Sequence, residues 1–160
     1  MDLPVRLVLR LELEELYAAY AACLDDGELE RWPEFFTAEC RYEIIPRENF
    51  DRDLPLAVMR CESRAMLADR VAALRRSSVY APRALRHLIS GVRIIAVDDD
   101  VISAQATYAL VQTLLDEEPT IMSVGRYLDR LVREAGALKF AERLCVYDSV
   151  LVPGSLIFPI

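Results

Sequence analysis

The second half of the chain contains four long segments, at about 84–97, 101–115, 120–134 and 137–152, in which apolar residues tend to alternate with others. In the second segment one face holds Ile102, Ala104, Ala106, Tyr108, Leu110 and Leu114. In the fourth, one face holds Leu138, Phe140, Leu144, Val146, Val150 and Val152. Alternation over this length predicts antiparallel strands with one face on a core. The separators DDD, DEEP and AGA are turn-like, so neighbouring strands should pair as a meander.

The first half is mainly helical by its apolar spacing. Before Gly27, which can end a helix in the left-handed conformation, five apolar residues share one helical face: Leu13, Leu16, Tyr17, Tyr20 and Leu24. Residues 28–36 predict a short helix in which Pro33 is tolerable only near the first turn. Residues 62–76 predict a third helix.

Two short strands are expected between these helices, at 40–47 and 56–61, with a polar loop at 49–55. Helices gathered first and a long antiparallel sheet second indicate an α+β domain. Strands this long twist, so the sheet should wrap around the first helix as an open cone. We find no linker and expect one domain over 1–160.

Composition excludes several classes of protein. A net charge of −7 argues against nucleic acid as a partner. The run 101–115 is too short and too polar to cross a bilayer, and charges interrupt the N-terminal apolar stretch, so we expect a cytoplasmic protein without a membrane partner. Apolar residues make up 54% of the chain, which indicates a dense core or a large surface buried against another subunit.

The cysteines and the single histidine offer little for a metal site. Cys23, Cys40, Cys61 and Cys145 lie far apart without paired spacing, and they are best interpreted as small buried hydrophobes. We therefore predict no metal or cofactor bound by this chain.

Three kinds of residue could carry chemistry. His87 could be a general base, although a hydrogen-bonded structural or interface role is favoured. Asp25 and Asp26 could form a carboxylate pair, although acids in a turn usually face solvent or a partner. Tyrosines could donate to a ligand in the cone, although packing with the hydroxyl on a polar neighbour is favoured; these are Tyr17, Tyr20, Tyr42 and Tyr108.

The stretch 46–70 is rich in charges of both signs, and three interpretations are open. Its arginines could grip an anionic substrate, pair with acids of the same chain, or meet a partner subunit. The mixed signs favour a subunit interface, for which the candidates are Arg47, Arg52, Arg60, Arg64 and Arg70, together with His87.

The order of five segments resembles a known family: 16–45, 46–75, 80–94, 107–131 and 138–160. Together they resemble the small (β) subunit of aromatic-ring-hydroxylating dioxygenases, best in the run PREN…MRCESRAMLADR and in RHLISGVRI. Gly91 departs from the family, which often has Asn there, and a glycine inside a strand suggests a bulge or a close backbone approach.

This resemblance implies a nuclear-transport-factor-2-like cone and a non-catalytic structural role in aromatic catabolism. Three small subunits would join three large ones, with small–small contacts in a trimer. The large subunit would carry a Rieske two-iron two-sulfur cluster and a mononuclear Fe(II). The run at 46–70 looks most like small subunits of enzymes that act on carboxylated aromatics. Two alternatives are open. One is a stand-alone isomerase or dehydratase of the same fold, with Asp25, His87 and Tyr17 converging in the cone, and the other is a homomeric interaction domain with no enzyme partner.

Overall fold

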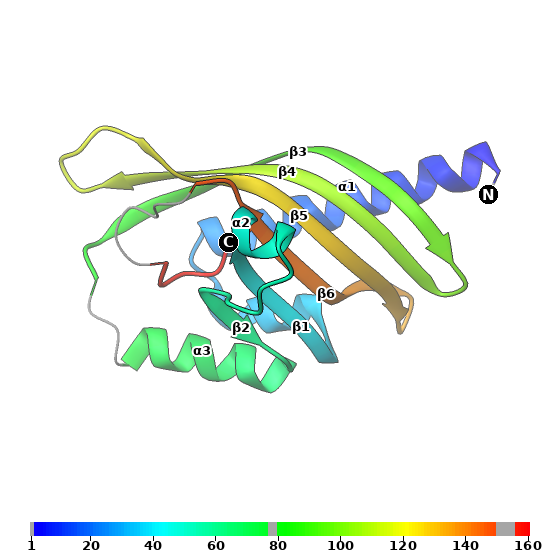
Figure 1. The fold of residues 1–160 in the computed structure, drawn as a ribbon, viewed down its shortest axis with the longest axis horizontal. Coiled ribbons are helices and arrows are strands. Elements are labelled where there is room, and N and C mark those ends of the chain that lie inside the picture. Colours follow the sequence, from blue (N-terminus) through cyan, green and yellow to red (C-terminus); the bar gives the residue numbers. More distant parts are fainter. Residues whose placement is uncertain (1, 77–79, 150–155) are drawn as a thin grey trace.

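The computed structural model describes residues 2–76, 80–149 and 156–160 (Figure 1). The helices are α1 (Leu3–Asp25), the 3-10 helix η1 (Leu29–Phe35), α2 (Arg47–Asp51) and α3 (Arg64–Arg76). The strands are β1 (Phe36–Pro46), β2 (Met59–Cys61), β3 (Arg83–Asp98), β4 (Val101–Leu114), β5 (Thr120–Glu134) and β6 (Ala137–Tyr147).

The six strands form one sheet in the order β2-β1-β6-β5-β4-β3. The predicted meander is confirmed, because β3, β4, β5 and β6 pair antiparallel in sequence. The direction of β1 was not predicted: β1 and β6 run parallel, so the sheet as a whole is mixed. Their connection passes through α2, β2, α3 and three strands of the meander, so no hairpin imposes an antiparallel direction.

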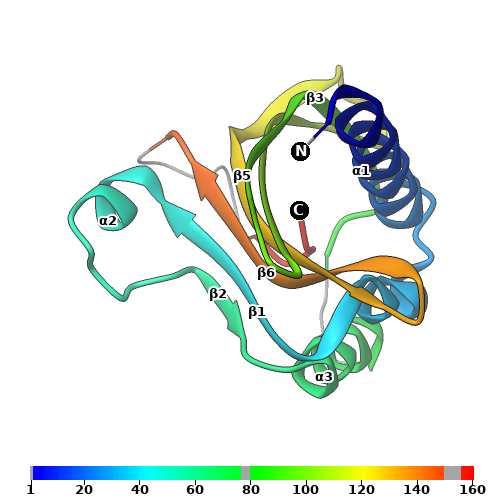
Figure 2. The ribbon, with the colours of Figure 1, turned by 90° about the vertical axis from the view of Figure 1, so that its right-hand side faces the viewer.

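The sheet curls into the expected cone, and α1 lies along its open side against β3 and η1 (Figures 1 and 2). Gly91 interrupts β3 with a φ of +62°, and the register with β4 shifts between Ser90 and Arg93. The predicted bulge is therefore present. Glycine suits it because other residues rarely adopt a positive φ.

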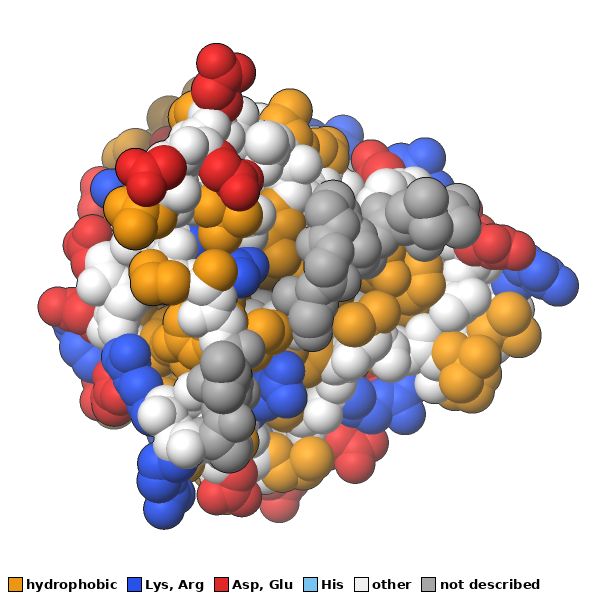
Figure 3. Space-filling view, turned by 90° about the vertical axis from the view of Figure 1, so that its left-hand side faces the viewer, with side chains coloured by type: hydrophobic (Ala, Val, Ile, Leu, Met, Phe, Trp, Pro, Cys, Tyr) orange, Lys and Arg blue, Asp and Glu red, His pale blue; other side chains and the backbone are white. Residues whose placement is uncertain are grey.

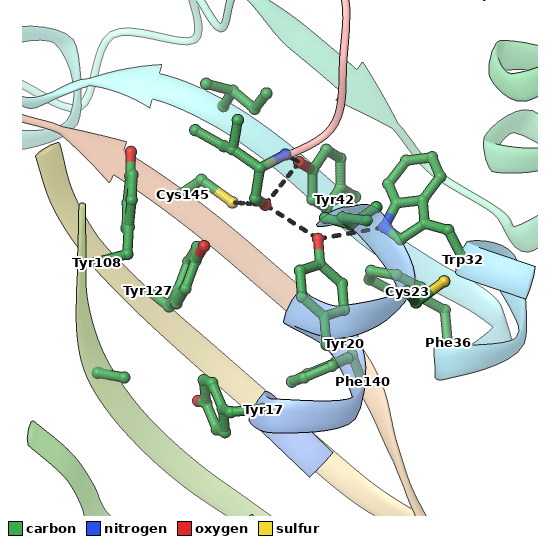
Figure 4. Packing of buried hydrophobic residues seen from close by; sticks show 14 of the residues in the cluster. Tyr17, Tyr20, Cys23, Trp32, Phe36, Tyr42, Tyr108, Tyr127, Phe140 and Cys145 are labelled. Atoms are coloured by element: carbon green, nitrogen blue, oxygen red, sulfur yellow. Dashed lines mark hydrogen bonds between the residues drawn. The ribbon is translucent and has the colours of Figure 1, made fainter. Parts of the chain in front are cut away.

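Aromatic side chains from α1, η1, β1 and β6 fill the middle of the cone (Figure 4). Most of their rings meet edge to face, an arrangement that the ring quadrupoles favour. All four cysteines are buried and free, as predicted. Burial raises the pKa of the Cys145 thiol to about 12 and that of Cys40 to about 11.

Several element boundaries differ from the prediction. Helix α1 begins at Leu3, well before the apolar stripe that predicted it. The expected loop at 49–55 begins inside helix α2. Pro33 lies inside η1, a 3-10 helix instead of an α-helix. The predicted strands differ in length, since β1 is longer and β2 shorter than expected.

The predicted face of the last strand is wrong beyond Phe140. Pairing with β5 skips one residue between Phe140 and Glu142, so the alternation reverses there. After this bulge Arg143, Cys145 and Tyr147 face the core, whereas Val146, although fully buried, lies outside the core cluster. The predicted positions 150 and 152 lie outside the described residues.

Candidate functional site

Three of the five predicted interface arginines pair with acids of their own chain. Arg47 contacts Asp148, Arg52 contacts Glu48 in the next helical turn, and Arg60 contacts Glu43. The remaining two donate to backbone carbonyls, Arg64 Nη1 to Phe36 at 3.5 Å and Arg70 Nη2 to Ile157 at 3.2 Å. The mixed signs at 46–70 thus reflect internal pairing in part.

Glu43 is the focus of a charged cluster on the outer face of β1. Its side chain is only 1% exposed, yet Arg41 Nε and Nη2 donate to its two oxygens at 3.0 and 3.1 Å. Arg60 contacts the same carboxylate from β2, and Arg41 also reaches Glu142 on β6 at 3.4 Å. The arginines themselves stay more than a third exposed, so they can still meet a partner subunit.

Asp25 and His87 do come together. At the end of α1, Asp25 Oδ1 lies 2.6 Å from His87 Nδ1, and the backbone N–H of His87 donates to both carboxylate oxygens at 3.1 and 3.0 Å. The Asp25 side chain is 11% exposed, so the expectation that these acids face solvent or a partner is wrong for Asp25, whereas Asp26 is exposed as expected. A hydrogen-bonded structural His87 is confirmed.

This contact sets the tautomer of His87. A carboxylate can only accept, so Asp25 holds a proton on Nδ1 and leaves Nε2 as the free ring nitrogen. Within the described part of the chain, buried Nε2 has no hydrogen-bond partner. The pair therefore joins α1 to β3 and keeps one ring nitrogen available inside the protein.

Tyr17 does not join this pair. It precedes Asp25 by two helical turns, about 12 Å along α1, and its hydroxyl donates to Asp129 on β5. Burial, followed by the negative charge of Asp129, raises the pKa of Tyr17 well above its ordinary value. The structure thus brings together two of the three residues of the alternative acid–base site. The favoured packing role is confirmed for all four tyrosines, whose hydroxyls each reach a polar neighbour.

A buried ion pair that sequence reasoning missed lies beside Tyr17. Arg143 Nε and Nη2 donate to the two oxygens of Asp129 at 3.0 and 2.8 Å, and both side chains are 0% exposed. The guanidinium lies within 5 Å of four ring centroids: Tyr17, Tyr20, Tyr127 and Phe140. Burial acts to lower the pKa of Arg143, but the charge and hydrogen bonds of Asp129 outweigh it and keep the pKa raised.

Residues 156–160 pack against the same core, in which Figure 4 shows the hydrogen bonds made by Tyr20 and Tyr42. The Ile160 carbonyl accepts from the Tyr20 hydroxyl at 2.9 Å and from the Tyr42 hydroxyl at 3.1 Å, and its side chain is fully buried. The Trp32 indole donates to Tyr20 at 3.1 Å. The tyrosines that could have faced a ligand therefore hold a segment of the chain itself.

The described residues hold neither a metal-binding cluster nor a membrane-spanning helix. No three His, Cys, Asp or Glu side chains form a group suited to a metal ion within the described ranges. Among the same residues, no helix is long and apolar enough to cross a membrane.

Comparisons with known proteins agree on one family. The SnoaL-like domain family matches residues 5–144. The small subunit of anthranilate 1,2-dioxygenase from Burkholderia cepacia is 38% identical over 93% of this chain and 92% of its own length. The beta 2 subunit of the terephthalate 1,2-dioxygenase terminal oxygenase component from a Comamonas species is 29% identical, covering 94% of this chain and 97% of its own.

A solved structure gives the same result. A protein assigned as the beta subunit of an aromatic-ring-hydroxylating dioxygenase from Novosphingobium aromaticivorans superposes with a TM-score of 0.89. It is 41% identical, and the match covers 98% of this chain and 99% of that one. Similarity thus extends over the whole cone.

Proposed function

Because this chain belongs to the small (β) subunits of aromatic-ring-hydroxylating dioxygenases, we propose that it is the non-catalytic structural subunit of a Rieske non-haem iron oxygenase. It would act as a single domain, in the cytoplasm, within a complex of three large and three small subunits. The large subunit would hold the Rieske cluster and the mononuclear Fe(II).

The number of histidines supports placing both iron centres in the large subunit. A Rieske centre needs two His and two Cys ligands, and a 2-His-1-carboxylate iron site needs two His as well. This sequence has one His, and its Nδ1 is already engaged by Asp25. In the proposed complex the iron ligands would therefore come from another chain.

We propose a carboxylated aromatic as the substrate of the complex. The support is chemical, because anthranilate and terephthalate, which name two of the relatives, are both aromatic carboxylates. The small subunit would contribute by holding the large subunits in place. Its candidate contacts are the exposed guanidinium groups of the 46–70 stretch, whereas the side chain of His87, the remaining candidate, is buried against Asp25.

Co-purification with a candidate large subunit tests the proposal. We expect the pair to form a hexamer that contains iron and consumes oxygen with anthranilate, terephthalate or salicylate, and much less with naphthalene. The chain alone should bind no iron. Preference for naphthalene would reject the carboxylate proposal and leave the structural role intact.

The same preparation tests the alternative enzyme, which the Asp25–His87 contact favours. If the chain alone converted a small ketone or alcohol, and His87→Gln abolished that activity, the structural-subunit proposal would be wrong. His87→Gln keeps a hydrogen-bond donor near Asp25 but removes the titratable ring nitrogen.

A further inference from the structure

The first half of α1 carries an unusual concentration of exposed aliphatic side chains. Leu3, Val5, Leu7, Val8 and Leu11 are each 53–68% exposed. Ile95 and Val97, near the end of β3, add 57% and 41%. We call these seven residues the α1 tip, and they are half of the exposed large apolar side chains in the described part of the chain. Figure 2 shows the start of α1 and the β3–β4 end facing the same way.

An acidic hollow of about 640 Å³ lies on one side of the α1 tip. It separates α1 from the ends of β3, β4 and β5, and its apolar wall includes Val5, Val8 and Ile102. Glu12 and Arg133, which also line it, form an ion pair. Asp99 and Asp100 have no cationic partner among the described residues, so this hollow has unneutralised negative charge.

A basic hollow of about 520 Å³ lies on the other side of the same helix, against the edge strand β3. Leu3, Leu7 and Ile95 form its apolar wall. Arg10 is paired with Glu14 in the next turn. Arg6 and Arg93 have no carboxylate partner within the described ranges, so here the uncompensated charge is positive.

The two hollows match each other. Each combines aliphatic side chains with two unpaired charges, and the signs are opposite. Aliphatic surface combined with complementary charges is typical of a specific protein interface. Copies of a chain of net charge −7 repel each other in general, so a basic surface that faces an acidic one favours self-association.

We propose that the α1 tip is a contact between copies of this chain, in which the basic hollow of one copy meets the acidic hollow of the next. Arg6 and Arg93 would pair with Asp99 and Asp100 of the neighbour while the aliphatic side chains pack between them. Two different surfaces meet in such a head-to-tail contact, and it can close into a ring. The proposed function, with its three small subunits, adds only that the ring would contain three copies.

Charge exchange tests this contact in the full-length chain by sedimentation at several concentrations. The acidic-side variant is Asp99→Asn with Asp100→Arg, where Asn suits the positive φ of 52° at position 99. The basic-side variant is Arg6→Asp with Arg93→Asp. Each should weaken self-association by at least about 10-fold, because like charges then face each other. The variant with all four changes should recover association to within about threefold of the original, since opposite charges face each other again.

Arg31→Asp, at a 63% exposed position on η1 and outside both proposed contacts, is the matched control and should leave association unchanged. If the variant with all four changes keeps the circular dichroism spectrum of the original chain but does not recover self-association, the proposal is wrong. A chain that stays monomeric alone would also overturn it.

Binding to the large subunit, measured in parallel, separates the two proposals. If the acidic-side and basic-side variants both self-associate normally but no longer bind the large subunit, the α1 tip is a contact for that partner instead. If the unmodified chain ignores the large subunit yet shows the predicted charge dependence, only the proposed function fails.

Discussion

The two halves of α1 lie in opposite surroundings although both are rich in aliphatic residues. From Leu13 to Asp25 the inner face is buried, and its polar groups meet partners in the same chain: Tyr17 with Asp129, Tyr20 with Ile160, and Asp25 with His87. From Leu3 to Leu11 most aliphatic side chains are exposed, and Arg6 has no acidic partner in the described ranges.

This difference separates what the chain satisfies alone from what it leaves for another molecule. Buried polar groups are costly unless they are paired, so the inner half of α1 is complete within one subunit. Exposed aliphatic residues beside unpaired charges are the features of an interface. The same helix therefore serves the fold at one end and, by our proposal, assembly at the other.

Breaking the buried ion pair should give the largest effect. Arg143→Met leaves Asp129 charged and unpaired in the middle of the cone, and we expect a loss of about 3–5 kcal/mol in the free energy of unfolding. Urea denaturation measures it. Arg52→Met, which breaks an exposed helical pair, should cost at most about 0.5 kcal/mol. Equal losses would show that the interior does not depend on its charge pairing.

Leucine truncation compares the two halves of α1 directly. Leu13→Ala empties a fully buried site and should cost about 2–5 kcal/mol. Leu7→Ala removes a side chain that is 53% exposed, and should change the stability of the monomer by less than about 0.5 kcal/mol. Thermal unfolding of dilute protein checks both. A large loss for Leu7→Ala under those conditions would contradict the comparison.

The C-terminal end of α1 is held to β3 by Asp25, which contacts His87. Asp25→Asn removes the charge that accepts both the backbone N–H and the ring N–H of His87, and we expect a loss of about 1–3 kcal/mol. The neighbouring Asp26 is exposed, so Asp26→Asn is the matched control and should be nearly neutral. Chemical denaturation at pH 7 distinguishes the two, and similar losses would mean that the His87 contact adds nothing.

The smallest effect belongs to an exposed pair that joins η1 to α3. Hydrogen bonds from Arg75 lower the pKa of Glu30 from 4.5 to about 2. A lowered pKa stabilises the folded state above pH 4.5, and this contribution disappears as the pH falls through about 2. The stability difference between the original chain and Glu30→Gln should shrink over that window. A difference that stayed constant as the pH falls from 4.5 to about 2 would contradict this prediction.

The alternation of apolar residues predicted the inward-facing side chains well wherever no bulge interrupts a strand. The inner face of β4 is confirmed from Ile102 to Leu110 because no bulge interrupts it there. In β6 a single skipped residue reverses the faces, and no turn residue in the sequence marks it. The parallel β1–β6 pair was also missed, since it depends on contacts between distant segments.

The candidate site was only partly predictable. Asp25 and His87 were both singled out, but their contact joins residues 62 positions apart and leaves no local pattern. A signal did exist for Asp129, because it lies in phase with Tyr127 and Leu131 on the inner face of β5. An acid at such a position predicts a buried cation nearby. The bulge in β6 hid Arg143, which supplies it.

The pairing of β1 with β6 also sets the order in which the fold can be completed. Phe36 aligns with Phe140, so more than a hundred residues must be made before the two strands can meet. At ordinary rates of translation this takes roughly 5–20 s. During that time α1 has left the ribosome without the strands that cover it. Folding dominated by such distant contacts is slow, so this subunit should need protection from aggregation while it is synthesised.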